Sequence, residues 1–253
     1  MSSPIISAFV IVVLLIAGPA TAADPDRLWR IVHADCVADQ LNHGAPAPCA
    51  EVALADGQER GYAVLKDKVG IAQFLLIPTR RLSGIESREL LEPGAPNYWQ
   101  AAWQERRRVE AALGRALPRD AIGLAVNSVA SRSQNQLHIH VDCLAGDVRN
   151  ALRHNEAAID AYWSDAPLML RGHPYRAMRI EGDEFADTDP FRLLADGISG
   201  AAATMGERTL VAAGAIFADG KPGFYLLSDR IDAVVQDAAG GEELLDHACV
   251  VAQ

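Results

Sequence analysis

The segment that most constrains the fold is residues 136–144, Gln-Leu-His-Ile-His-Val-Asp-Cys-Leu, in which polar and apolar side chains alternate. Successive side chains of a β-strand point to opposite faces of the sheet, so this pattern predicts a strand with one apolar and one polar face. Leu137, Ile139 and Val141 are expected to enter a core. The polar face would carry four residues: Gln136, His138, His140 and Asp142. One face is therefore core and the other is a candidate site.

The rest of the chain predicts an α+β fold built on that strand. Periodicity and turn residues predict four further strands, over 60–67, 70–82, 121–128 and 175–182, and a hairpin over 209–230 that turns near Asp219-Gly220. Helical spacing predicts helices over 28–40, 96–117 and 146–163, with Asp147 as the cap of the last, and one more that begins at Asp189-Pro190. We therefore expect an antiparallel sheet with flanking helices, extended by the C-terminal half, with residues 24–253 as one domain.

Residues 1–23 are predicted to be a leader and not part of the fold. Residues 5–17 form an apolar run that is too short for a comfortable membrane span, and Ala20-Thr21-Ala22 has the small-x-small pattern of a signal-peptidase site. The run also lacks the basic residues that usually precede a signal peptide, so two alternatives stay open. The segment is either a cleaved signal peptide or an N-terminal membrane anchor, and in both cases the rest of the chain faces an oxidising compartment.

The four cysteines fit that compartment, because disulfides persist outside the cytosol and the number is even. Cys36 and Cys49 flank a turn-rich segment whose ends can meet, which predicts Cys36–Cys49 and, by remainder, Cys143–Cys249. Because no C-x-x-C pair is present, a zinc site built from these cysteines is disfavoured.

The charge and the polar strand together limit the chemistry. The formal net charge of −10 gives no field that would attract nucleic acid, so an anionic substrate must be held by local donors. A neutral imidazole, with a pKa of about 6.5, is a good nucleophile toward phosphorus, and a protonated one can hold a phosphate oxygen. Candidate donors surround the histidine strand: Asn127, Ser131, Arg132, Ser133, Gln134 and Asn135.

Metal binding is the alternative chemistry for the same strand. The H-x-H-x-D pattern could supply three ligands to zinc, but a further ligand would have to come from a distant histidine: His33, His43, His154, His173 or His247. The chain has no dense carboxylate cluster for magnesium, so we expect no obligatory metal and no cofactor.

The motif around the histidines resembles a known family. The stretch NSVASRSQNQLHIHVDC, with LLIPTRRLSGIES before it, CVADQ and PCAEV near the start and LRGHPYRAMRI after it, is similar to the CDP-diacylglycerol pyrophosphatase family of the histidine triad superfamily. The resemblance covers about Leu28 to Cys249. It implies a histidine-triad-like fold and hydrolysis of CDP-diacylglycerol to CMP and phosphatidate at a membrane surface. The implied location is the bacterial inner membrane, with one N-terminal anchor and a periplasmic catalytic domain, or the periplasm after signal cleavage.

The resemblance leaves the register of the histidines open. The superfamily has three alternating histidines, whereas this chain offers two between Gln136 and Asp142. In the preferred register, Gln136 replaces the first histidine, His138 is the nucleophile and His140 contacts phosphate, and Ser133 keeps its place three residues before the pattern. In the other register His140 attacks and Asp142 takes the phosphate position, which keeps the superfamily's spacing of thirteen positions from Asn127 to the nucleophile.

The roles implied by the preferred register are those of a two-step nucleotidyl transfer. His138 attacks the phosphorus attached to cytidine, phosphatidate leaves, and water hydrolyses the CMP-histidine intermediate. Asn127, Ser133 and His140 would contact the phosphoryl oxygens, with Arg132 and Gln134 as weaker candidates. Solvent exposure is at least as good an explanation as a role in the site for three further cations: Lys66, Arg80 and Arg81. The missing third histidine leaves one alternative function, a non-catalytic periplasmic nucleotide- or lipid-binding protein on the same fold.

Overall fold

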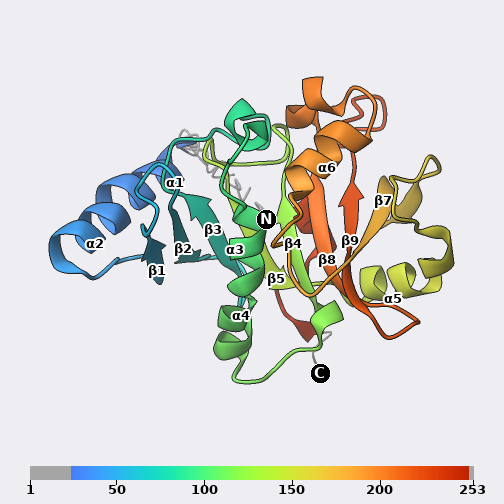
Figure 1. Cartoon of the computed structure of the whole chain (residues 1–253), viewed down its shortest axis with the longest axis horizontal. Helices are drawn as coiled ribbons and strands as arrows, with labels where there is room; N and C mark the ends of the chain where they lie inside the picture. Colours follow the sequence, from blue (N-terminus) through green and yellow to red (C-terminus); the bar gives the residue numbers. More distant parts are fainter. Residues whose placement is uncertain (1–23, 251–253) are drawn as a thin grey trace, which may run out of the picture.

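The computed structural model describes residues 24–250, which form one nine-stranded antiparallel sheet with helices on both faces (Figure 1). The strand order is β1-β2-β3-β5-β4-β8-β9-β7-β6. The strands are β1 (Glu51–Ala53), β2 (Tyr62–Lys66), β3 (Phe74–Pro78), β4 (Ile122–Val126), β5 (Ile139–Cys143), β6 (Leu168–Leu170), β7 (His173–Glu181), β8 (Leu210–Ile216) and β9 (Pro222–Ser228). The predicted α+β class is confirmed, and the C-terminal half extends the same sheet.

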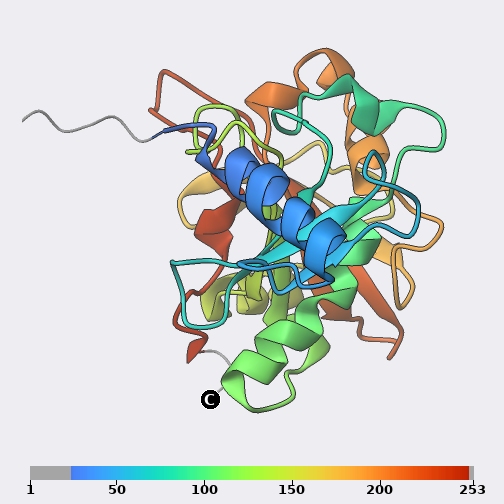
Figure 2. The same cartoon turned by 90° about the vertical axis from the view of Figure 1, so that its left-hand side faces the viewer.

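Within residues 24–250, six α-helices and several shorter helical turns flank the sheet. They are α1 (Arg27–Arg30), α2 (Ala38–His43), α3 (Tyr98–Gln104), α4 (Arg106–Leu113), α5 (Gly146–His154) and α6 (Pro190–Gly197). A π-helical segment, Ile31–Val37, joins α1 to α2, so that all three form one N-terminal helix (Figure 2). Gly44 ends this helix in the left-handed conformation, at φ 68°. Asp189 accepts a hydrogen bond from the Phe191 N–H and so caps α6, as its sequence predicts.

The alternation of the histidine strand determines which face of the sheet carries a site. Leu137, Ile139 and Val141 are buried in the largest core cluster, which α3, α4 and α6 complete on one face. The opposite face has two separate clusters. One is formed under the N-terminal helix by β1 to β3, and the other lies under α5 over β7 to β9. His138 and His140 project to this second face, between the two clusters.

Two predicted helices differ from those observed. The helix expected over 96–117 is divided into α3 and α4 at Glu105, whose buried carboxylate binds the guanidinium groups of Arg107 and Arg108. The helix expected over 146–163 ends at His154, and Asp147 pairs with Arg171 instead of capping it. The short strands β1 and β6 were not predicted, because three residues carry too little periodicity.

Both predicted disulfides are present. Cys36–Cys49 joins the N-terminal helix to the residues just before β1. Cys143–Cys249 joins the end of β5 to residues 245–250, the C-terminal segment. The second bridge fixes the last described residues beside the histidine strand.

The predicted localisation at the inner membrane through a single N-terminal anchor is wrong. Within residues 24–250, no helix is long and apolar enough to cross a membrane. The predicted leader, residues 1–23, lies outside the described residues.

Candidate active site

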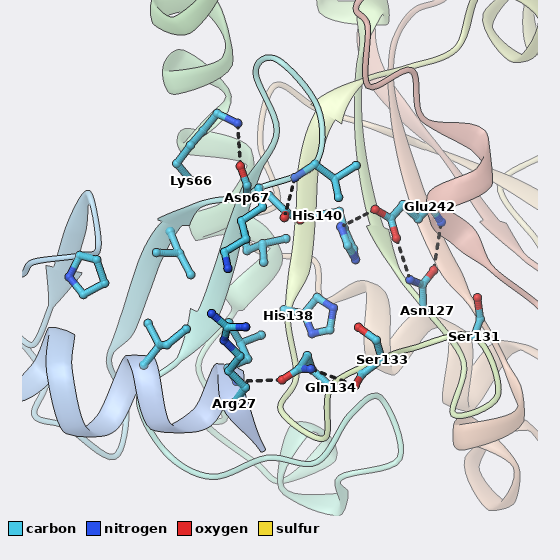
Figure 3. Close-up of a pocket in the computed structure, with 17 residues that line it drawn as sticks. Arg27, Lys66, Asp67, Asn127, Ser131, Ser133, Gln134, His138, His140 and Glu242 are labelled. Atoms are coloured by element: carbon cyan, nitrogen blue, oxygen red, sulfur yellow. Dashed lines mark hydrogen bonds and ion pairs between the residues drawn. The ribbon is translucent and has the colours of Figure 1, made fainter. Parts of the chain in front are cut away.

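A cavity of about 660 Å³ opens on the polar face of the histidine strand. Its walls come from the N-terminal helix, the end of β2 with the turn that follows it, the 127–134 segment and the residues just before the C-terminal segment. Figure 3 shows both imidazoles at its centre, with Glu242 on one side and Lys66 and Asp67 on the other. Five of the six predicted catalytic and substrate-binding residues line this one cavity: Asn127, Ser133, Gln134, His138 and His140.

His138 is held in one orientation by its own backbone. It directly precedes β5, and its Nδ1 lies 2.7 Å from the carbonyl oxygen of Gln136. A carbonyl only accepts, so Nδ1 carries the proton and donates it. Burial lowers the pKa of His138, although the Gln136 carbonyl and the carboxylate of Glu242 oppose this effect. The ring is therefore neutral at neutral pH, with the lone pair on Nε2.

His140 is the more deeply buried imidazole. Its ring centroid lies 4.8 Å from that of His138, at an interplanar angle of 64°. Burial, and then the neighbouring His138, lower the pKa of His140 to about 4, although Glu242 opposes the shift. Neither ring nitrogen has a hydrogen-bond partner among the described residues, although Nδ1 lies 3.3 Å from Oε1 of Glu242. A ligand that enters the cavity can therefore bond to an imidazole that is otherwise unsatisfied.

Glu242, which the sequence analysis did not single out, is held in place by a set of hydrogen bonds. Its N–H donates to Oδ1 of Asn127 at 3.0 Å, and the amide of Asn127 donates back to Oε2 at 3.2 Å. The amide of Gln73 donates to Oε1 at 3.2 Å, and Nε2 of His247 lies 3.4 Å from the same oxygen. Burial raises the pKa of Glu242, but His140 and these amide donors outweigh it, and the net direction is downward. The carboxylate is thus ionised and aimed at His140.

Asp142, the last polar residue of the strand, lies apart from the cavity. It is fully buried, its Oδ2 lies 2.8 Å from Nδ1 of His247, and its Oδ1 accepts the Cys143 N–H. Burial raises its pKa to about 6, against the effect of His247. Gln136 is likewise buried, and its amide donates to the backbone carbonyls of Pro78 and Arg80. The two outer positions of the polar face therefore serve the fold, and the two histidines face the cavity.

The remaining predicted donors divide into two kinds. Asn127 and Ser133 reach the cavity with side chains, although the amide of Asn127 is already bonded to Glu242. Gln134 accepts the Leu28 N–H at 2.8 Å and so joins the 127–134 segment to the N-terminal helix. Arg132 does not line the cavity, because its guanidinium forms two bonds with Glu86 at 2.6 and 2.8 Å. Arg132 therefore stabilises the 127–134 segment and does not contact the cavity.

Sequence reasoning missed two of the cations at the edge of the cavity, Arg27 and Lys68, and left the third, Lys66, undecided between a role in the site and solvent exposure. Arg27 and Lys68, together with Lys66, line it on two sides (Figure 3 labels Arg27 and Lys66). Apolar side chains complete the wall between them: Leu28, Ile31, Pro48, Leu65, Val69 and Leu75. The cavity therefore combines local positive charge with an apolar surface in a protein whose net charge is −10.

One group of side chains in the site has the composition of a metal centre. Ligand atoms of Asp67, His140 and Glu242 lie within 4.8 Å of one another. However, the amide nitrogen of Gln73 donates to Asp67 at 2.7 Å as well as to Glu242, so a neutral donor already bridges the two carboxylates. The residues present therefore fit a hydrogen-bonded network better than a cation site.

The fold and the site define an α+β protein with two buried, neutral histidines in a cavity edged with cations, which suits an anionic ligand. The chain belongs to the CDP-diacylglycerol pyrophosphatase family, whose model matches residues 23–253. It is 41% identical over 229 residues to the CDP-diacylglycerol pyrophosphatase of Yersinia pestis. The matched region covers 90% of this chain and 86% of the Yersinia pestis protein. The family predicted from the motif is confirmed.

Proposed function

We propose that this protein hydrolyses CDP-diacylglycerol to CMP and phosphatidate with His138 as the nucleophile. The observation that carries the proposal is the bond from His138 Nδ1 to the Gln136 carbonyl, because it places the lone pair on Nε2 of a neutral ring that lines the cavity. Family membership supports the substrate.

The reaction takes two displacements at one phosphorus atom. Nε2 of His138 attacks the phosphorus attached to cytidine, a P–N bond forms, and the P–O bond to phosphatidate breaks with its electron pair on the leaving oxygen. Water then attacks the same phosphorus, the P–N bond breaks, and CMP leaves while the imidazole becomes neutral again. His140, Asn127 and Ser133 line the same cavity and would donate to the phosphoryl oxygens, and the cations Arg27 and Lys66 at its edge would favour binding of the pyrophosphate.

Two observations favour this register over the one in which His140 attacks. Asp142 would then have to contact phosphate, but it is buried away from the cavity and bonded to His247. His140 has no backbone acceptor comparable to the carbonyl that orients His138. The histidine triad superfamily, with Gln136 in the place of the first histidine, is part of this proposal.

The test is the covalent intermediate. Rapid quenching into denaturing base, in which a P–N bond survives, should yield protein labelled with CMP on His138 after mixing with cytidine-labelled substrate. The alternative function, a binding protein without turnover, predicts tight binding of the substrate with neither labelled protein nor released CMP.

The depressed pKa of the nucleophile leads to an expected pH profile. Attack needs neutral His138, and its pKa is lowered from 6.5 by burial. Protonation at lower pH removes the lone pair, so kcat/KM should stay level from pH 8 to about 6.5 and decline only below that range. Steady-state rates measured across pH 4–8 check this expectation. A decline that begins above pH 7 would show that a different group, with a higher pKa, controls the attack.

Glu242→Gln is expected to lower kcat/KM roughly tenfold or more, because it removes the ionised carboxylate that lies 3.3 Å from Nδ1 of His140 and raises the pKa of that imidazole. Glu242 is a positioning residue that acts through His140. Because its carboxylate raises the pKa of His140, its loss should lower that pKa further and move the part of the pH profile that depends on His140 to lower pH. Glu243→Gln is the matched control, since Glu243 bonds to Tyr175 and does not line the cavity. Equal effects of the two substitutions would contradict a role for Glu242.

Location and membrane contact belong to the same proposal. Two disulfides are typical of proteins in oxidising compartments, which supports the secreted, periplasmic alternative. The diacyl tails of the substrate keep it in a bilayer, so the cavity has to work at a membrane surface.

A further inference from the structure

The turn between β2 and β3 exposes apolar side chains at the edge of the cavity. Asp67, Lys68 and Val69 from this turn line the cavity. Val69 is 54% exposed and Ile71 is 60% exposed, although both are large apolar residues. Isolated exposed apolar residues are common on soluble proteins, but two on one short turn beside a lipid-substrate site indicate a contact surface.

The turn is held in this exposed arrangement by several hydrogen bonds. The Val69 N–H donates to Oδ1 of Asp67 at 3.1 Å, and Nζ of Lys66 donates to the carbonyls of Asp67 and Gly70. The Ile71 N–H donates to the carbonyl of His247 at 2.9 Å, which ties the turn to the C-terminal segment. The backbone of the turn is therefore already ordered, so binding of a partner to the exposed apolar side chains would not have to offset a loss of backbone entropy.

Charge separates this turn from the other exposed apolar pair of the described chain. Val234 and Val235 are 91% and 68% exposed, but Asp232 and Asp237 flank them. Val69 and Ile71 instead follow two exposed lysines, Lys66 and Lys68, and the carboxylate between these lysines, Asp67, is half-buried and accepts hydrogen bonds from Gln73 and the Val69 N–H. Anionic lipid headgroups attract lysines and repel carboxylates, so only the β2–β3 turn matches a bilayer in both charge and hydrophobicity.

We propose that residues 66–71 dock the protein on an anionic lipid bilayer, with Val69 and Ile71 entering the interface and Lys66 and Lys68 contacting lipid phosphates. This inference rests on the proposed function for the identity of the partner. It adds the surface through which the folded chain reaches its substrate, and it places the cavity opening against the headgroups.

The first test is flotation of the full chain with vesicles of phosphatidylcholine and phosphatidylglycerol that contain no substrate. Ile71→Asp should lower the vesicle-bound fraction at least about threefold, because it places a charge at the interface. Met169→Asp is the matched control: Met169 is 58% exposed on β6, at the opposite edge of the sheet, and its substitution should leave binding unchanged. Unchanged binding by Ile71→Asp, or a larger loss with Val234→Asp, would overturn the proposal.

A second test reports the depth of the turn directly. The fluorescence of a tryptophan introduced as Ile71→Trp should be quenched by vesicles made with brominated phosphatidylcholine. Met169→Trp should show no more quenching than the wild-type protein. Equal quenching of both variants would rule out insertion of the turn, whatever else in the chain holds it to the vesicle.

The activity assay separates this proposal from the proposed function. Ile71 does not line the cavity, so Ile71→Asp should hydrolyse detergent-dispersed CDP-diacylglycerol at the wild-type rate and lose activity only on vesicles. If the wild type and Ile71→Asp both fail to hydrolyse the substrate while their vesicle binding differs as expected, the proposed function fails and the docking surface stands. If both hydrolyse vesicle-borne substrate equally, the docking surface fails and the function stands.

Discussion

His138→Ala is expected to lower the release of CMP from CDP-diacylglycerol by at least about a thousandfold, because it removes the atom that forms the covalent intermediate. The side chain lines the cavity and contributes no volume to the apolar core clusters, so the fold should persist. The measurement is kcat for CMP release, together with the thermal midpoint as a check on folding. Labelled protein should no longer be trapped by the quench.

The control for this prediction is another histidine. His154 lies exposed at the end of α5, and His154→Ala should keep wild-type turnover. His140→Ala should lower turnover as well, but it should leave the nucleophile able to form the adduct. If His138→Ala is active and His140→Ala is dead, the roles shift by two residues and the proposed register fails.

Removal of the Cys143–Cys249 disulfide is expected to cost about 2–5 kcal/mol of unfolding free energy. The bridge closes 106 residues, so its loss frees far more of the unfolded chain than loss of the Cys36–Cys49 bridge, which closes 13. The entropic model places the difference between the two at about 2 kcal/mol. Denaturant titration of the two double-alanine variants under non-reducing conditions measures both costs.

The same disulfide is expected to matter for activity, because it holds the segment that contains Glu242 and His247 against β5. The Cys143→Ala/Cys249→Ala variant should therefore lose turnover under conditions in which it is still folded, whereas Cys36→Ala/Cys49→Ala should lose less. A larger loss of stability from the short bridge would contradict the loop-length argument and point to strain or packing instead.

The features of the site that could be predicted are those that depend on the local periodicity of the sequence. Alternation over residues 136–144 predicted that His138 and His140 share a face opposite Ile139, because side-chain direction in a strand depends only on position along it. The spacing of Trp99 and Trp103 predicted a buried helix face for the same reason. The break at Glu105 was not predictable, since it depends on a buried carboxylate that binds its neighbouring arginines.

The leader shows where a local pattern was not sufficient. The apolar run at residues 5–17 predicted either a signal or an anchor, and the anchor was assigned from the resemblance and from the lipid nature of the substrate. Composition alone does not distinguish these alternatives. The membrane contact proposed for Val69 and Ile71 depends instead on their exposure, which only the structure gives, because the burial of a side chain depends on what packs over it and not on its own identity.

The sequence by itself determined the antiparallel α+β fold, the family, the two disulfides and the face that carries the histidines. Tertiary structure decided how those histidines are used. His247 lies 105 residues beyond Asp142, which it contacts, and Glu242 comes from the same distant part of the chain, whereas Gln73 directly precedes β3, the strand beside β5. Which of them meets His140 depends on the order and register of strands that are not neighbours in sequence. Arg132 was assigned to the substrate from its place in the loop, but Glu86, 46 residues away, binds it instead. Local patterns fix the direction of a side chain, whereas the partner that it meets is fixed only when distant segments pack together.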